Sequence, residues 1–169
     1  MRGITPAQTV GPFLSLGLNW SDGPNAADPA TPGAVRIGGR LFDGNGDPVT
    51  DGLIETWQVD PEIRAFGRCL TDPSGKWAIV TRKPPSLPTP GGDTEAPHLD
   101  VSIFARGLLH RLITRIYFAD EGAANATDPV LSALSDDSRR RTLIAEAVDG
   151  GYVLDIHLQG PDETVFFTV

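Results

Sequence analysis

The stretch AVRIGGRLFDGNGDPVTDGLIETWQV (residues 34–59) decides the fold class, because it holds two short strand-like runs around a turn-rich segment. Residues 34–42 and 53–59 are rich in β-branched, aromatic and other apolar residues, a composition typical of strands. Most of the residues between them are Gly, Asp, Asn or Pro, which favour tight turns. We therefore predict a β-hairpin over residues 34–59.

The same pattern recurs along the chain. Residues 72–75 (DPSG) predict a turn before a strand over 76–82, and the later runs HLDVSIFA, RLITRIYF, GYVLDIHLQG and ETVFFTV read as further strands. Helix signals are confined to residues 128–147, where Ser135 is a candidate N-cap and Gly150 would end the segment. We expect an all-β fold, a β-sandwich of about seven to eight short strands with one or two short helices near residues 128–147.

The length of 169 residues predicts a single domain over residues 1–169, with an N-terminal arm at about residues 1–20. Two segments lack periodic apolar positions and are expected to be exposed loops. They are residues 21–34 and the proline-rich residues 83–97.

Composition excludes several classes of partner. A formal net charge of −8 argues against nucleic acid, and the basic run 139–141 follows Ser and Asp, as expected of a solvated helical face. No apolar run is long enough to span a membrane, and the first residues do not read as a signal peptide. With a single cysteine, Cys69, a cytoplasmic location is the expectation.

One pattern resembles a metal site. The chain has no Gly-rich phosphate loop, G-x-S-x-G, HExxH or CxxC motif. His98, Asp100 and His157 would supply the two histidines and one carboxylate of an Fe(II) site. The alternative is a solvent-facing His157 on an outer strand, and residues 158–169 contain no Lys or Arg for a cosubstrate carboxylate.

Other charged residues have simpler interpretations. Strand alternation places Arg106 on the same face as His98, yet roughly 26 Å away, so the two serve different purposes unless the strand bends. A charge at the rim of the sheet is the plain interpretation of Arg106. Asp60 and Glu62 flank Pro61, which favours a solvated turn over an acid–base pair.

Several stretches together resemble the intradiol ring-cleaving dioxygenases, and among them the subunits that do not bind iron. They are TPAQTVGPF, DGNGDPVTDGLIETWQVDP, FGRCLTDPSGKW, APHLDVSIFARGL, TRIYFADE and DETVFFTV, in the order of the family and over nearly the whole chain. The resemblance implies a β-sandwich and a role as the α subunit of an α/β oxidoreductase. The chain is shorter than usual α subunits, around residues 21–34 and 60–66.

The resemblance also implies where iron would be held. Catalytic β subunits of this family bind Fe(III) through two tyrosines and two histidines. Here the histidine pair appears as His98 and Asp100, the region of one ligand tyrosine holds Leu87, and residues 59–66 contain no tyrosine. His98, Asp100 and Leu87 are thus vestigial positions. The family pattern implies that this chain binds no metal, carries no catalytic residue and is inactive alone, with Fe(III) in the partner β subunit.

The family pattern gives this chain a share of the substrate pocket. By position in the motifs, the substrate-binding residues are Thr9, Gly11, Pro12 and Arg106. The implied substrate is protocatechuate, a small aromatic molecule whose carboxylate a guanidinium would bind. Two alternatives stay open: a stand-alone Fe(II) oxygenase using His98, Asp100 and His157, and a non-enzymatic β-sandwich binding module.

Overall fold

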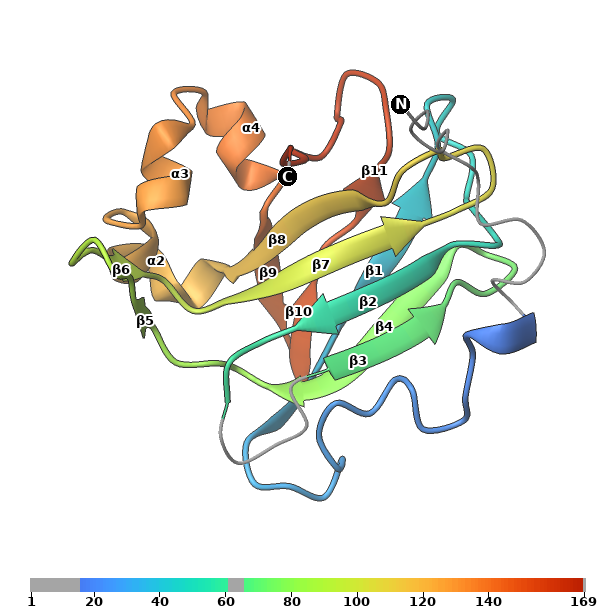
Figure 1. Ribbon diagram of the computed structural model, residues 1–169, viewed down its shortest axis with the longest axis horizontal. Coiled ribbons are helices and arrows are strands. Elements are labelled where there is room, and N and C mark those ends of the chain that lie inside the picture. Colours follow the sequence, from blue (N-terminus) through green and yellow to red (C-terminus); the bar gives the residue numbers. More distant parts are fainter. Residues whose placement is uncertain (1–15, 61–65, 169) are drawn as a thin grey trace, which may run out of the picture.

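The computed structural model describes residues 16–60 and 66–168, which form two packed β layers with short helices at one end (Figure 1). The strands are β1 (Ala34–Phe42), β2 (Leu53–Trp57), β3 (Phe66–Leu70), β4 (Lys76–Arg82), β5 (Leu87–Pro88), β6 (Thr94–Glu95), β7 (His98–Phe104), β8 (Leu112–Phe118), β9 (Ile144–Val148), β10 (Gly151–Val153) and β11 (Ile156–His157). The helices are η1 (Ala119–Glu121), α2 (Gly122–Asn125), α3 (Pro129–Ala133) and α4 (Asp137–Arg141).

One nine-stranded sheet folds over to make both layers. Its order is β11-β1-β10-β9-β8-β7-β2-β3, and β4 pairs with β1. Strand β9 pairs antiparallel with β10 and parallel with β8, so it joins one layer to the other. The buried side chains of Ile37, Ile54, Ile79, Ile103 and Ile116 belong to one core cluster. The predicted sandwich is therefore confirmed.

The hairpin predicted over residues 34–59 is wrong. Strand β1 pairs with β4, β10 and β11, whereas β2 pairs with β3 and β7 in the other layer. The turn after β1 is stabilised by local contacts. Asp43 accepts backbone hydrogen bonds from Asn45 and Asp47, and Pro48 forms a β-bridge with Phe42. Both strands still bury apolar side chains in one core, because they lie in opposite layers of the sandwich and their inner faces pack against each other.

Other local predictions are confirmed. Residues 72–75 form the expected turn, in which Gly75 has a φ of +74° and its N–H donates to the Asp72 carbonyl at 2.9 Å. Strand β4 follows at residue 76, and β7 and β8 match the runs HLDVSIFA and RLITRIYF. Strands β4 and β7 alternate buried and less buried positions along most of their length, as expected of strands with one face in the core.

The last third of the chain contains the two short helices, α3 and α4, predicted near residues 128–147. Three details differ from prediction, and the first is that the N-caps are Asp128 and Asp136, not Ser135. Residues 144–148 form strand β9 because they pair on both sides. Residues 163–168 of the run ETVFFTV form no strand, although the Phe167 N–H donates to the Ile113 carbonyl at 2.8 Å.

The two segments predicted as exposed loops are partly anchored. In residues 21–34, Ala26 and Ala27 are buried, and the Ala27 N–H donates to Val80 at 3.0 Å. Residues 83–97 contain the short β5–β6 pair, and Lys83 binds Asp120 at 2.7 Å and Glu121 at 2.8 Å. No helix in the described part of the chain has the length and hydropathy of a membrane-spanning segment.

Candidate functional site

His98 and Asp100 begin strand β7, at the end of the sandwich where helices α2–α4 and the β5–β6 ribbon gather (Figure 1). They share one face of the strand, as alternation predicts. His98 is buried and its Nδ1 lies 2.8 Å from the Ala96 carbonyl oxygen. The Asp100 side chain is 55% exposed. The two residues that would be metal ligands in the family pattern therefore lie side by side.

A guanidinium occupies the space beside them. Arg115 lies on β8 in register with Asp100, and its Nε donates to Asp100 Oδ1 at 3.0 Å. A second nitrogen, NH1, donates to Glu95 Oε1 at 3.0 Å. His98 Nε2 is 3.7 Å from Glu95 Oε2 and 3.9 Å from Asp100 Oδ1. Arg115 thus stands between two carboxylates that both face the histidine.

Tyr117 and Asp128 complete this polar cluster. Tyr117 accepts a bond from Arg115 at 3.3 Å and donates to Asp128 Oδ1 at 3.1 Å. Burial raises the pKa of the Tyr117 phenol, which stays protonated at neutral pH. Asp128 is fully buried, accepts the Ala96 N–H at 2.8 Å and caps helix α3. The cluster therefore ties β7, β8 and α3 together.

The donor atoms do not fit the ferric site that the resemblance implies. Such a site needs phenolate ligands, and Tyr117 is a neutral phenol already bound to a carboxylate. Leu87 lies on β5 opposite Glu95, where its carbon side chain offers no ligand atom. Over residues 16–60 and 66–168, no group of three or more His, Cys, Asp or Glu side chains is arranged to hold a metal.

The three-ligand Fe(II) arrangement is not assembled. His157 lies on β11, which pairs with β1, and its ring stacks on Phe42 with centroids 4.9 Å apart. His98 and Asp100 lie on β7, in the other layer. The hypothesis that combined His98, Asp100 and His157 in one site is therefore wrong.

Arg106 lies just beyond the opposite end of β7. Its side chain is 80% exposed, and its Nε is 3.1 Å from Asp51 Oδ2. An ion pair this exposed contributes little to stability, so the guanidinium can exchange Asp51 for another anion. The other proposed substrate-binding residues, Thr9, Gly11 and Pro12, lie outside the described residues.

Two further expectations concern charged residues. Asp60 is buried and its Oδ2 lies 3.3 Å from Arg82 NH2, so the solvated-turn interpretation of Asp60 is wrong. Glu62 lies outside the described residues. Arg139 and Arg141 are exposed on α4, as expected of a solvated face, and Arg140 pairs with Asp137 at 2.6 Å.

Sequence reasoning missed the residues that organise the site. The sequence pattern does not mark Arg115, Glu95 and Asp128 as site residues. Strand alternation in LITRIYF does place Arg115 and Tyr117 on one face. Strand alternation does not predict that Arg115 lies opposite Asp100, because this register depends on how β7 pairs with β8.

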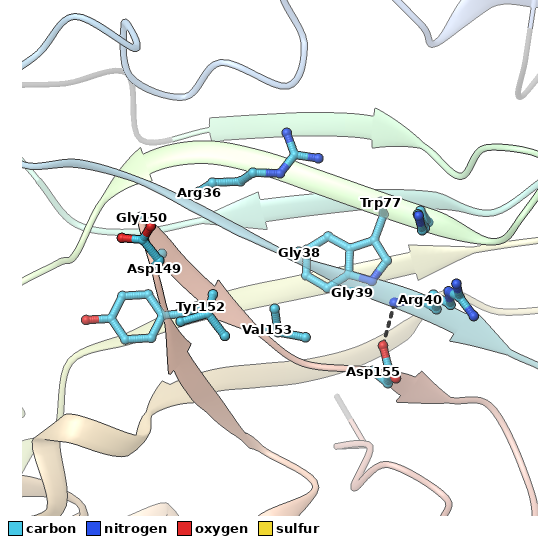
Figure 2. A pocket seen from close by; sticks show the side chains of 13 residues that line it. Arg36, Gly38, Gly39, Arg40, Trp77, Asp149, Gly150, Tyr152, Val153 and Asp155 are labelled. Carbon is cyan, nitrogen blue, oxygen red and sulfur yellow. Dashed lines mark hydrogen bonds between the residues drawn. The ribbon is translucent and has the colours of Figure 1, made fainter.

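A separate groove of about 440 Å³ crosses the outer face of the layer formed by β4, β1 and β10 (Figure 2). Arg36, Arg40 and Lys76 line it together with Asp149 and Asp155. The Arg40 backbone N–H donates to Asp155 Oδ1 at 2.8 Å, the dashed line in Figure 2. None of the described residues that the sequence proposed for the site lines this groove.

The single cysteine is set apart from this chemistry. Cys69 is buried on β3, and burial raises the pKa of its thiol from 9.0 to about 11. Because the thiolate is the reactive form, we expect labelling by a disulfide reagent at pH 8 to be about 100-fold slower in the native protein than in urea. The unfolded thiol ionises first, so stability should fall as pH rises above about 9. Equal labelling rates in both states would contradict the buried placement.

Comparison with known proteins reveals close relatives. A family profile described as "Dioxygenase" matches residues 21–159. The protocatechuate 3,4-dioxygenase alpha chain of Pseudomonas putida is 39% identical over 191 aligned residues, covering 96% of this chain and 95% of the relative. The alpha chain of the same enzyme from Burkholderia cepacia is 38% identical, covering 98% and 97%. The beta chain from B. cepacia is 30% identical, covering 77% and 66%.

Solved structures share the fold. The dioxygenase domain of a carbohydrate-binding fusion protein from Streptomyces sp. SirexAA-E superposes with a TM-score of 0.61 at 24% identity, over 92% of this chain and 98% of that chain. Catechol 1,2-dioxygenase from Acinetobacter sp. ADP1 gives a TM-score of 0.61 at 17% identity. That match covers 79% of this chain and 55% of the enzyme. The profile match and the full-length relatives together place this chain in the intradiol dioxygenase family.

Proposed function

We propose that this chain is the α subunit of a protocatechuate 3,4-dioxygenase and works with a β subunit that holds Fe(III). The complex cleaves the aromatic ring of protocatechuate between its two hydroxylated carbons with O2 and yields 3-carboxy-cis,cis-muconate. The observation that carries this proposal is the Arg115 guanidinium beside His98 and Asp100, where a metal-binding chain of the family would place its ligands. Two relatives of nearly full length bear the alpha-chain name.

In this proposal the chain contributes part of the substrate pocket. Arg106 binds the carboxylate of protocatechuate, because an exposed guanidinium presents fixed donors to that group. Thr9 offers a hydroxyl, and Gly11 and Pro12 shape the pocket wall through close backbone approach. This assignment of Thr9, Gly11, Pro12 and Arg106 follows the family motifs.

Exposed aromatic surface supports an association with a partner chain. Trp57 is 53% exposed at the end of β2 and packs on Phe66 with ring centroids 4.7 Å apart. Val59 beside it is also exposed. Large aromatic side chains are enriched in protein interfaces. A relative of the β type matches this chain as well, which fits two subunits of common fold.

The remaining parts of the proposal concern context. We propose a single domain over residues 1–169, since the main sheet runs through both layers and the core. We also propose a cytoplasmic location, with which a single buried cysteine agrees. The iron of the complex belongs to the β subunit alone.

Co-purification tests the proposal. The chain is expressed with and without a β subunit of this family, and O2 uptake is measured on protocatechuate and on catechol. We expect a stable complex that consumes O2 on protocatechuate, weak uptake on catechol, which lacks the carboxylate, and none from the chain alone. Failure to co-purify, or uptake by the chain alone, would contradict the α-subunit assignment, and failure to co-purify would favour a non-enzymatic binding module.

A further inference from the structure

We propose that Arg115 is a built-in cation that keeps the His98 cluster closed to metal ions, and that its removal opens a divalent-metal site. The ligands of that site would be His98, Glu95 and Asp100. The inference concerns this chain alone, so it stands or falls independently of the β-subunit proposal.

The distances favour a latent metal site. His98 Nε2 lies 3.7 Å from one Glu95 oxygen and 3.9 Å from one Asp100 oxygen. Ligand atoms around Zn²⁺ or Co²⁺, at bond lengths of about 2.0–2.2 Å, are about 3.0–3.5 Å apart. Each pair therefore needs to close by less than about 1 Å. One imidazole and two carboxylates form a donor set that both metals accept.

In this structure the positive charge of Arg115 neutralises the two carboxylates, as a bound metal ion would. Two of its nitrogens bind the two carboxylates, each at 3.0 Å. This cation occupies one oxygen of each carboxylate, and it repels any metal ion that approaches His98. A guanidinium does not lose its proton at physiological pH, so the exclusion is permanent.

The arrangement is fixed by the fold. Arg115 is paired in register with Asp100 across β7 and β8, and it makes a third bond to the Tyr117 hydroxyl at 3.3 Å. Its side chain is mostly buried, as are those of His98 and Glu95. Burial therefore restricts the Glu95, His98 and Arg115 side chains, whereas the half-exposed Asp100 side chain is positioned by its bond to Arg115.

The test is a titration of the tag-free chain with Co²⁺, followed by calorimetry and by the ligand-field bands of bound Co²⁺. We expect Arg115→Gln to bind one equivalent at least about 100-fold more tightly than the wild-type chain, because the substitution frees both carboxylates from the guanidinium and removes a repelling charge beside His98. Arg115→Lys retains the cation and is expected to bind no better than wild type. Adding His98→Ala to Arg115→Gln should abolish the gain.

Arg140→Gln is the matched control, because it removes an arginine from another Arg–Asp pair, on α4, away from the cluster. Circular dichroism and a thermal melt establish that each variant is folded, and Arg115→Met serves as a second uncharged variant should Arg115→Gln fail to fold. A rise of the melting temperature on adding Co²⁺ to either uncharged variant supports the inference. The inference is overturned by equal affinity in wild type and the folded uncharged variant, by binding to Arg115→Lys as tight as to Arg115→Gln, or by a gain that survives His98→Ala.

Discussion

We expect Arg106→Ala, assayed in the complex with the β subunit, to raise the KM for protocatechuate about 10- to 100-fold with a smaller change in kcat. The reason is the loss of a charge-assisted hydrogen bond to the substrate carboxylate. The Arg106 side chain is 80% exposed and held only by a surface ion pair with Asp51, so its loss should not disturb the fold. Steady-state O2 uptake at varied protocatechuate measures both constants.

Two controls isolate the carboxylate contact. Arg111→Ala removes an exposed arginine from the same β7–β8 connection and should leave KM unchanged. Catechol has no carboxylate, so Arg106→Ala should alter its turnover little. A KM for protocatechuate equal to that of the unmodified complex would return Arg106 to the role of a rim charge.

Asp128→Ala should be the most destabilising substitution near the site. Asp128 is fully buried and accepts four hydrogen bonds, from Ala96, Val130 and Leu131 backbone N–H groups and from the Tyr117 hydroxyl. Its removal leaves those donors unsatisfied and uncaps α3, at a cost of about 3–5 kcal/mol. For a chain of this size, the melting temperature should fall by about 10 °C or more.

A second helix cap supplies the comparison. Asp136 caps α4 by accepting the Ser138 N–H at 2.8 Å, but it is exposed and lies outside the cluster. Asp136→Ala is expected to cost about 1 kcal/mol, the usual value for an N-cap. Similar melting temperatures for the two variants would show that Asp128 does no more than cap a helix.

Much of the fold follows from local sequence. Strand-type composition and turn residues predict strands β4, β7 and β8 and the turn at Gly75. The pairing of β1 with β4 and β10 could not be predicted, because the turn residues after residue 42 do not determine in which layer the next strand lies. Residues 144–148 likewise form a strand because they pair with β8 and β10, and these tertiary contacts outweigh the local helix propensity.

Only part of the candidate site could be predicted from the sequence. The pattern His98-x-Asp100 marked the place, and the family motifs marked Arg106 at the other end of the strand. The residue that decides the chemistry, Arg115, comes from β8, and only the register of the β7–β8 pair sets it against Asp100. Glu95 and Asp128 reach the cluster from a short ribbon and a helix cap, whose positions depend on packing at that end of the sandwich.

The central proposal is that the partner β subunit, and not this chain, binds the Fe(III). It is tested most directly by measuring iron content and visible absorption of the chain purified alone and of the complex purified after co-expression with the β subunit. We expect an iron-free, colourless chain and a red-brown complex with one Fe(III) for each α/β pair. A ferric-tyrosinate absorption band and bound iron in the isolated chain would contradict it.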